Sequence, residues 1–99
     1  MNLGKLMEKG KYKLCLYVAG ESQKSNKAIE NLERYCQEHL EDGYTIEIID
    51  LRQNPHLAEK EQIVATPTLI KMLPDPIRVL IGDLSDKHKF LIGMNIISE

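Results

Sequence analysis

The feature that most constrains the fold is a strand–helix–strand pattern in the first half of the chain. Residues 12–19 form an almost wholly apolar run, interrupted by Lys13 and followed by Gly20. A run without polar alternation is typical of a strand covered on both faces, as in a parallel sheet. Residues 44–51 alternate and are rich in β-branched side chains, which predicts a second strand. Because a long crossover separates the two strands, we expect them to pair in parallel with right-handed connectivity.

An amphipathic helix is predicted between these strands. Its apolar residues recur at helical spacing and form one stripe, while acidic residues cover much of the remaining surface. Ser22 or Ser25 can cap the first turn, because a serine oxygen accepts a hydrogen bond from a free backbone N–H. Gly43 is expected to end the helix. The residues of the apolar stripe are Ile29, Leu32, Cys36 and Leu40.

The second half begins with a short helix and two strands. Asn54 is expected to cap the short helix, with Pro55 at the first helical position, where no needed hydrogen bond is lost. Strands are predicted over residues 68–73 and 77–81, joined by the stiff turn at residues 74–76.

The pattern of the last segment fits either a helix or a strand. Ser85 can cap a helix, with Asp86 in its first turn. Residues 90–97 are apolar and rich in isoleucine, but Gly93 weakens a helix there, and the same stretch would suit a strand. With a helix at this position, the order β-α-β-α-β-β-α predicts an α/β sandwich of the thioredoxin-like class.

Two segments point to a thioredoxin-like scaffold without redox chemistry. Residues 65–69 (Ala-Thr-Pro-Thr-Leu) resemble the proline loop that opens a strand in such domains, where a cis proline is common. The position of the redox pair, just after the first strand, holds Ser22 and Ser25 instead. Thiol–disulfide exchange needs a thiolate, so no catalytic residues are expected. The alternative is a glutathione-type site in which the serine hydroxyls contact a bound thiol.

The cysteines and histidines do not form a redox or metal motif. Cys15 and Cys36 are too far apart in the sequence for a Cys-x-x-Cys pair or a zinc ribbon. Cys15 lies in a predicted strand and Cys36 on the helical stripe, so both are interpreted as buried free thiols. The three histidines are too scattered to suggest a metal site. We therefore expect neither a metal nor a cofactor.

Length and charge limit the remaining functional classes. The 99 residues suit a single domain over 1–99, with residues 1–11 as a flexible N-terminal arm. Residues 1–29 carry six lysines and two acids, whereas residues 30–61 carry nine acids and three bases. This asymmetry indicates either ordinary solvated surfaces or a polarised docking surface. The sequence has no basic stripe interleaved with aromatic residues, so we expect no nucleic-acid partner. No apolar run approaches the ~20 residues of a membrane span. We expect a cytoplasmic protein.

A longer, ordered set of motifs resembles the KaiB family of circadian clock proteins. The resemblance extends over residues 12–97. Asn95 and Ser98 depart from it, because cyanobacterial members usually carry Asp and Tyr there. The matching residues lie at 13–20, 49–50, 54–55, 57–59, 65–69, 73–74, 76, 78, 81–85 and 91–93.

The resemblance implies a non-enzymatic regulator. It would bind a KaiC-type RecA-like ATPase ring, in a circadian clock or a clock-derived stress-response system. Further implied partners are KaiA or a KaiB-like sensor kinase, and a homo-oligomer would be a dimer or tetramer. A thioredoxin-like redox or glutathione-binding protein is the alternative function.

The resemblance also implies fold switching between the thioredoxin-like form and the alternative KaiB ground-state fold, and we expect the thioredoxin-like form to dominate. Pro67, Gly93 and Asn95 are the candidate switch positions; Pro67 either shapes its turn or acts as a slow latch.

Contacts with the ring are assigned to Lys27, Lys71 and Arg78, against the alternative that these are ordinary solvated charges. The edge of the second strand could also add to a partner's sheet.

Overall fold

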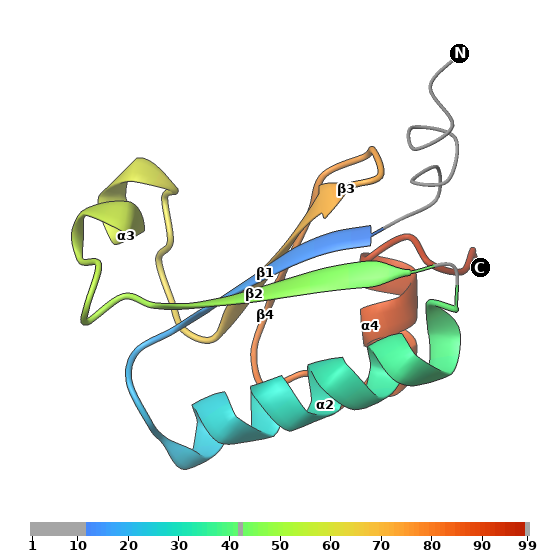
Figure 1. Cartoon of the computed structure of the whole chain (residues 1–99), viewed down its shortest axis with the longest axis horizontal. Helices are drawn as coiled ribbons and strands as arrows, with labels where there is room; N and C mark the ends of the chain where they lie inside the picture. Colours follow the sequence, from blue (N-terminus) through green and yellow to red (C-terminus); the bar gives the residue numbers. More distant parts are fainter. Residues whose placement is uncertain (1–11, 42, 99) are drawn as a thin grey trace.

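The computed structural model of the chain describes residues 12–41 and 43–98; the predicted arm at residues 1–11 lies outside them. The elements follow the predicted order β-α-β-α-β-β-α, which confirms the thioredoxin-like class (Figure 1). They are β1 (Tyr12–Val18), α2 (Gln23–His39), β2 (Tyr44–Asp50), α3 (His56–Lys60), β3 (Thr68–Leu73), β4 (Arg78–Ile81) and α4 (Lys87–Gly93).

The four strands form one mixed sheet in the order β2-β1-β3-β4. β1 pairs in parallel with β2, as the sequence predicts, and antiparallel with β3. β4 continues the sheet as an antiparallel neighbour of β3. The central place of β1 explains its apolar sequence, and β2 and β4 are left as the two edges of this sheet.

Helices α2 and α4 cover one face of the sheet, which we call the helix face (Figure 1). Strand residues such as Leu14, Leu16 and Leu69 are fully buried there against Leu32 and Phe90 of the two helices. Most of the hydrophobic core lies in this layer. Since each fully buried side chain of this size contributes about 1.5–3 kcal/mol, this layer holds the domain together.

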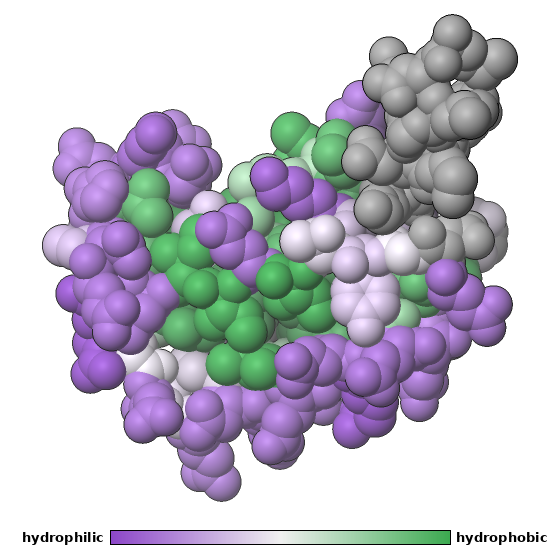
Figure 2. Space-filling model, in the orientation of Figure 1, coloured by the Kyte–Doolittle hydropathy of each residue, from purple (hydrophilic) through white to green (hydrophobic). Residues whose placement is uncertain are grey.

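The opposite face is less well covered, and we call it the open face. Its central residues Cys15, Tyr17 and Ile70 are buried, but the five-residue α3 has no buried residue of its own. The strand register aligns Cys15 and Ile70 with Val79 on the edge strand β4. Val79 is exposed, so the covering of the open face does not extend to this strand. Seen from the β2 edge, Figure 2 shows apolar side chains gathered over the strands, between the polar surfaces of α2 and α3 on the two sides of the sheet.

The local start of α2 is as expected. The Ser22 Oγ accepts from the Ser25 N–H at 3.1 Å, so Ser22 is the cap and Ser25 is the first-turn residue that it satisfies. The helix ends at His39 with Leu40 as its C-terminal cap, so Gly43, at a φ of +117°, lies just beyond its end rather than at it.

Two other predicted caps are wrong. Asn54 does not cap α3, because its Nδ2 donates instead to the Asp50 carbonyl at 3.2 Å. Ser85 does not cap α4; Asp86 does, accepting from the Lys89 N–H at 3.0 Å. In both cases a competing local hydrogen bond or a neighbouring carboxylate decided which side chain met the helix. The uncertain last segment is helical only as far as Gly93.

Candidate partner-binding surface

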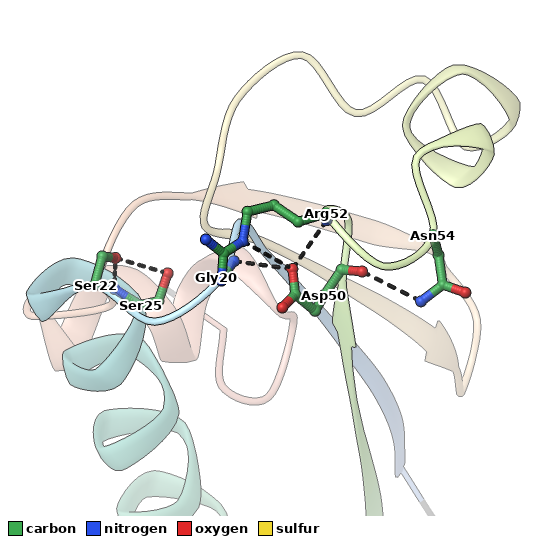
Figure 3. Close-up of polar contacts among 6 residues, drawn as sticks. All are labelled: Gly20, Ser22, Ser25, Asp50, Arg52 and Asn54. Carbon is green, nitrogen blue, oxygen red and sulfur yellow. Dashed lines mark hydrogen bonds and ion pairs between the residues drawn. The ribbon is translucent and has the colours of Figure 1, made fainter.

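The start of α2 occupies the position of a thioredoxin-type redox pair, and here it holds hydroxyls (Figure 3). The Ser22 hydroxyl donates to the Ser25 Oγ at 3.0 Å while it accepts from the Ser25 N–H. Both side chains thus serve the helix start. Their predicted structural role is confirmed, and neither supplies a sulfur nucleophile.

Asp50 joins the two loops that leave this end of the sheet (Figure 3). Its Oδ1 accepts from the backbone N–H of Gly20 and that of Arg52, each at 2.9 Å. These two hydrogen bonds, Arg52 first, hold the pKa of Asp50 below its usual value. Gly20 has a φ of +67°, and a Cβ there would overlap the Arg52 guanidinium. The loop before α2 and the loop before α3 are therefore fixed to one carboxylate.

The two cysteines are free and buried, as predicted. Cys15 belongs to the apolar cluster of the open face, whereas Cys36 lies in the core on the helix face. Burial raises the pKa of Cys15, and it raises the pKa of Cys36 to about 12. Because the sheet separates two thiols that are protonated near neutral pH, they cannot work as a redox pair.

The three basic candidates border β4 but differ in exposure. Lys71 and Arg78 are partners in the β3–β4 register, and Lys27 on α2 is one of the charges that act on Asp83, just beyond the other end of β4. Lys27 and Arg78 are exposed. Lys71 is 1% exposed, with its Nζ 5.7 Å from the centre of the Tyr12 ring. Burial, and then the charge of Arg78, lowers the pKa of Lys71.

Direct contact with a partner is thus open to Lys27 and Arg78, while Lys71 lies beneath the surface. Their assignment to ring binding stays a prediction. The burial of Lys71 was not foreseen, because a lysine within a strand gives no signal of which face will be covered.

The three candidate switch residues lie at junctions of the C-terminal half. The Thr66–Pro67 bond is cis, and the Pro67 carbonyl accepts from the Gly82 N–H at 2.9 Å. Gly93 ends α4 above Leu80 of β4, and Asn95 follows with a φ of +59°. Their role in switching also stays a prediction.

Sequence reasoning missed the exposed apolar residues around β4. Val79 is 57% and Ile81 52% exposed on the open face, and Val64 opposite them is 88% exposed. With Ile63 and Ile70 they line a hollow of about 170 Å³. A signal was present: Val79, Leu80 and Ile81 are all apolar, so an edge strand made of them must expose apolar side chains on one face.

The sequence was compared with protein families and with curated proteins. The model of the KaiB domain family matches residues 15–96. The chain belongs to the KaiB family. A circadian clock protein KaiB3 from Synechocystis sp. is 47% identical over 93 residues, covering 94% of this chain and 91% of the relative. A circadian clock oscillator protein KaiB from Microcystis aeruginosa is 47% identical over 88 residues, covering 89% of this chain and 85% of the relative.

Solved structures place this KaiB-family chain among thioredoxin-like folds. Chloroplastic thioredoxin z superposes with a TM-score of 0.70 at 18% identity, covering 97% of this chain and 90% of its own. The N-terminal domain of SasA from Synechococcus elongatus superposes with a TM-score of 0.69 at 24% identity, covering 83% of this chain and 79% of its own. At these identities the similarity concerns the fold alone.

Within residues 12–41 and 43–98, no helix has both the length and the apolar character needed to cross a membrane.

Proposed function

We propose that this KaiB-family chain is a non-enzymatic regulator in a circadian clock or a clock-derived stress-response system, acting by binding a KaiC-type RecA-like ATPase ring. The observation that carries the proposal is the start of α2, where Ser22 and Ser25 are engaged with each other at the position of a redox pair. The relatives at 47% identity are named circadian clock proteins. A redox scaffold without its thiols is left with surface recognition as its means of action.

The surface around β4 is suited to such recognition. Val79 and Ile81 form its exposed apolar centre on the open face. Arg78 begins the strand on its helix-face side, and Lys27 of α2 lies near Asp83 at the other end. Protein interfaces commonly combine an apolar centre with a polar rim. Rim charges act mainly on the rate of association and on the choice of partner. A partner with apolar side chains for Val79 and Ile81 and carboxylates for Arg78 and Lys27 would fit this surface.

The proposal is tested by measuring binding of the purified chain to the KaiC-type ATPase of its own organism, with ATP and with ADP. We expect association in at least one nucleotide state. Arg78→Glu and Lys27→Glu should each weaken it by about tenfold, equivalent to about 1.4 kcal/mol. Lys60→Glu on α3 is the matched control, since it makes the same charge change at an exposed position outside β4 and α2. No association in either nucleotide state would refute the proposal.

The alternative, a thioredoxin-like redox or glutathione-binding protein, gives a different result in a disulfide-reduction assay. We expect no turnover, because Cys15 and Cys36 lie on opposite faces of the sheet and are both buried. Robust reduction that the double variant Cys15→Ser, Cys36→Ser abolishes would establish a thiol mechanism and overturn the regulatory proposal.

The proposal extends to the cell and to further partners. We place the protein in the cytoplasm, with KaiA or a KaiB-like sensor kinase as additional candidates for binding. Among the residues that the structure describes, β2 is an edge strand of the sheet, so it offers backbone groups to which a partner's strand could add. Fold switching between the thioredoxin-like form and the alternative ground-state fold belongs to the same proposal. NMR chemical shifts of residues 55–97 would report both forms if they coexist.

A further inference from the structure

The edge strand β4 has one free side, because in the described part of the chain it pairs with β3 alone. The Gly82 N–H donates to the Pro67 carbonyl at 2.9 Å, so this pair is hydrogen-bonded. Bonded and non-bonded pairs alternate along an antiparallel ladder, which makes Leu80 a residue that bonds to β3. The N–H and C=O groups of Val79 and Ile81 therefore point away from β3, toward the free side of β4.

The side chains of β4 do little to protect this edge. Edge strands in soluble proteins are usually protected by charges, by prolines or by covering elements. Within β4 only Arg78 is charged, and the three residues after it are apolar. Val79 and Ile81 are exposed on the open face. An edge of this kind is a template to which an extended segment of a partner can add.

Hollows border β4 on both faces of the sheet. On the open face, the hollow of about 170 Å³ lies beside Val79 and Ile81. On the helix face, a second hollow of about 380 Å³ lies between Leu80 and α4. Successive side chains of a strand point to opposite faces, so a single strand added beside β4 would direct side chains toward both hollows. The second hollow is lined by Leu80, Asp86, His88, Lys89, Ile92 and Gly93.

The residue types along β4 specify the chemistry of the added segment. In an antiparallel pairing, the residue opposite Arg78 would be acidic, because opposite charges directly across two strands stabilise a sheet. The residue opposite Leu80 would be a large apolar one, since it faces the hollow that Leu80 and Ile92 line. The residues opposite Val79 and Ile81 would be apolar, since they cover these exposed side chains. From its N-terminal to its C-terminal end, such a segment has three apolar residues followed by an acidic one.

We propose that the partner of this chain adds an extended segment antiparallel to β4, hydrogen-bonded to the backbone of Val79 and Ile81, with three successive apolar residues followed by an acidic residue opposite Arg78. The segment continues the sheet as a further strand. This inference rests on the proposed function, because it names the chemistry by which the KaiC-type ATPase is recognised at the surface around β4.

The test is residue-resolved amide hydrogen exchange of the full-length chain, alone and with the KaiC-type ATPase in the nucleotide state that associates. We expect exchange at Val79 and Ile81 to slow at least tenfold on binding, because their N–H groups gain acceptors. The Leu80 amide already bonds to β3, so its exchange should change less.

The outcomes separate this inference from the proposed function. Association without added protection at Val79 and Ile81 would overturn the inference and leave the proposed function standing. No association in either nucleotide state would refute both. Protection that arises in the chain alone as its concentration rises would assign the edge to a second copy, and it would also overturn the inference.

A pair of proline variants tests the backbone contact directly. Val79→Pro removes an outward N–H and leaves the β3 ladder intact, which edge strands tolerate, and it should weaken binding at least tenfold. Ile48→Pro on the other edge strand, β2, is the matched control and should leave binding to the ATPase unchanged. The Leu51 N–H donates to the Val18 carbonyl at 2.8 Å, and alternate N–H groups of a parallel strand point to the same neighbour, so the Ile48 N–H also points outward.

A third variant separates backbone pairing from side-chain contact. Val79→Ala keeps the N–H and shortens the side chain, so it should weaken binding less than Val79→Pro does. Equal effects of these two substitutions, or loss of binding in a folded Ile48→Pro protein, would refute strand addition at β4. The exchange measurement on the wild-type chain remains decisive if a proline variant does not fold.

Discussion

The helix face and the open face of the sheet are built from alternating residues of the same strands, yet they differ in what covers them. β1 gives Leu14 and Leu16 to the helix face and Cys15 and Tyr17 to the open face. Two helices seal the first face, whereas α3 and the segment after it cover only part of the second, and β4 is left exposed. The difference indicates a division of roles: the helix face stabilises the fold, and the open face with its β4 edge is available for recognition.

The largest effect should come from breaking the helix face. Phe90 is fully buried, with its ring centre 5.0 Å from that of Tyr35. Phe90→Ala should lower the free energy of unfolding by about 3–5 kcal/mol, because it removes buried surface and leaves a cavity. Urea denaturation measures this, with the exposed Val79→Ala as the control, expected to change stability by less than about 0.5 kcal/mol. Equal losses for the two variants would contradict the difference between the faces.

A smaller loss is expected from one polar contact within the same layer. The Tyr35 hydroxyl donates to the Leu84 carbonyl at 2.7 Å and so ties α2 to the loop before α4. Tyr35→Phe keeps the ring but leaves a buried carbonyl without that donor, at a cost of about 1–3 kcal/mol. Denaturation should show this loss, and the slow-exchanging amides of α4 should show a parallel loss of protection. Unchanged stability would mean that the hydrogen bond between Tyr35 and Leu84 does not stabilise the loop.

Stabilising the helix face should also be measurable. Gly93 ends α4, and a Cβ there would meet Leu80 Cδ1 at 3.7 Å, an ordinary contact. Gly93→Ala should raise the free energy of unfolding by about 0.5–1 kcal/mol, since alanine is the better helix former. If the alternative fold is populated, the same substitution should shift the NMR populations toward the thioredoxin-like form. A loss of stability would show that α4 does not continue to Gly93 in solution.

On the open face, a substitution should weaken partner binding without changing the stability of the fold. Ile81→Ser should change the free energy of unfolding by less than about 0.5 kcal/mol, because Ile81 is exposed. The same change should weaken binding to the KaiC-type ATPase, measured by titration, because Ile81 belongs to the apolar centre of the surface around β4. A destabilisation comparable to that of Phe90→Ala would place Ile81 in the core and remove the distinction between the faces.

The smallest effect concerns Asp50, which holds the loops leading to the coverings of both faces. Its pKa is lowered in the folded state, so its contribution to stability is present above the unfolded pKa near 3.9 and is lost as the pH falls through the lower folded value. The melting temperature of the wild type should therefore fall on acidification more than that of Asp50→Asn. Thermal melts at pH 7 and pH 3 measure this difference, and identical slopes would contradict it.

Much of the fold could be predicted because its signals are local. The apolar run of β1, the stripe of α2 and the alternation of β2 identified each element, and the long crossover implied the parallel pair. The caps at Asn54 and Ser85 were wrong because several neighbouring polar side chains compete for the same N–H groups, and small differences in loop geometry decide among them.

The candidate surface was harder to predict because it depends on which face of a strand is covered. In β3, Leu69 and Lys71 share one side and Thr68 and Ile70 the other. Nothing in residues 68–73 says that the side with the lysine would be buried. The apolar exposure of Val79 and Ile81 has the same origin, since it follows from the position of β4 at the edge of the sheet.

By itself, the sequence determined the elements, the parallel β1–β2 unit and the replacement of redox thiols by Ser22 and Ser25, because these depend on residue type and short-range spacing. Only the tertiary structure decided the strand order, the burial of Lys71, and the two edges and one open face of the sheet. Those features depend on contacts between segments far apart in the chain, and the face that the helices leave uncovered is fixed only when the whole sheet has formed.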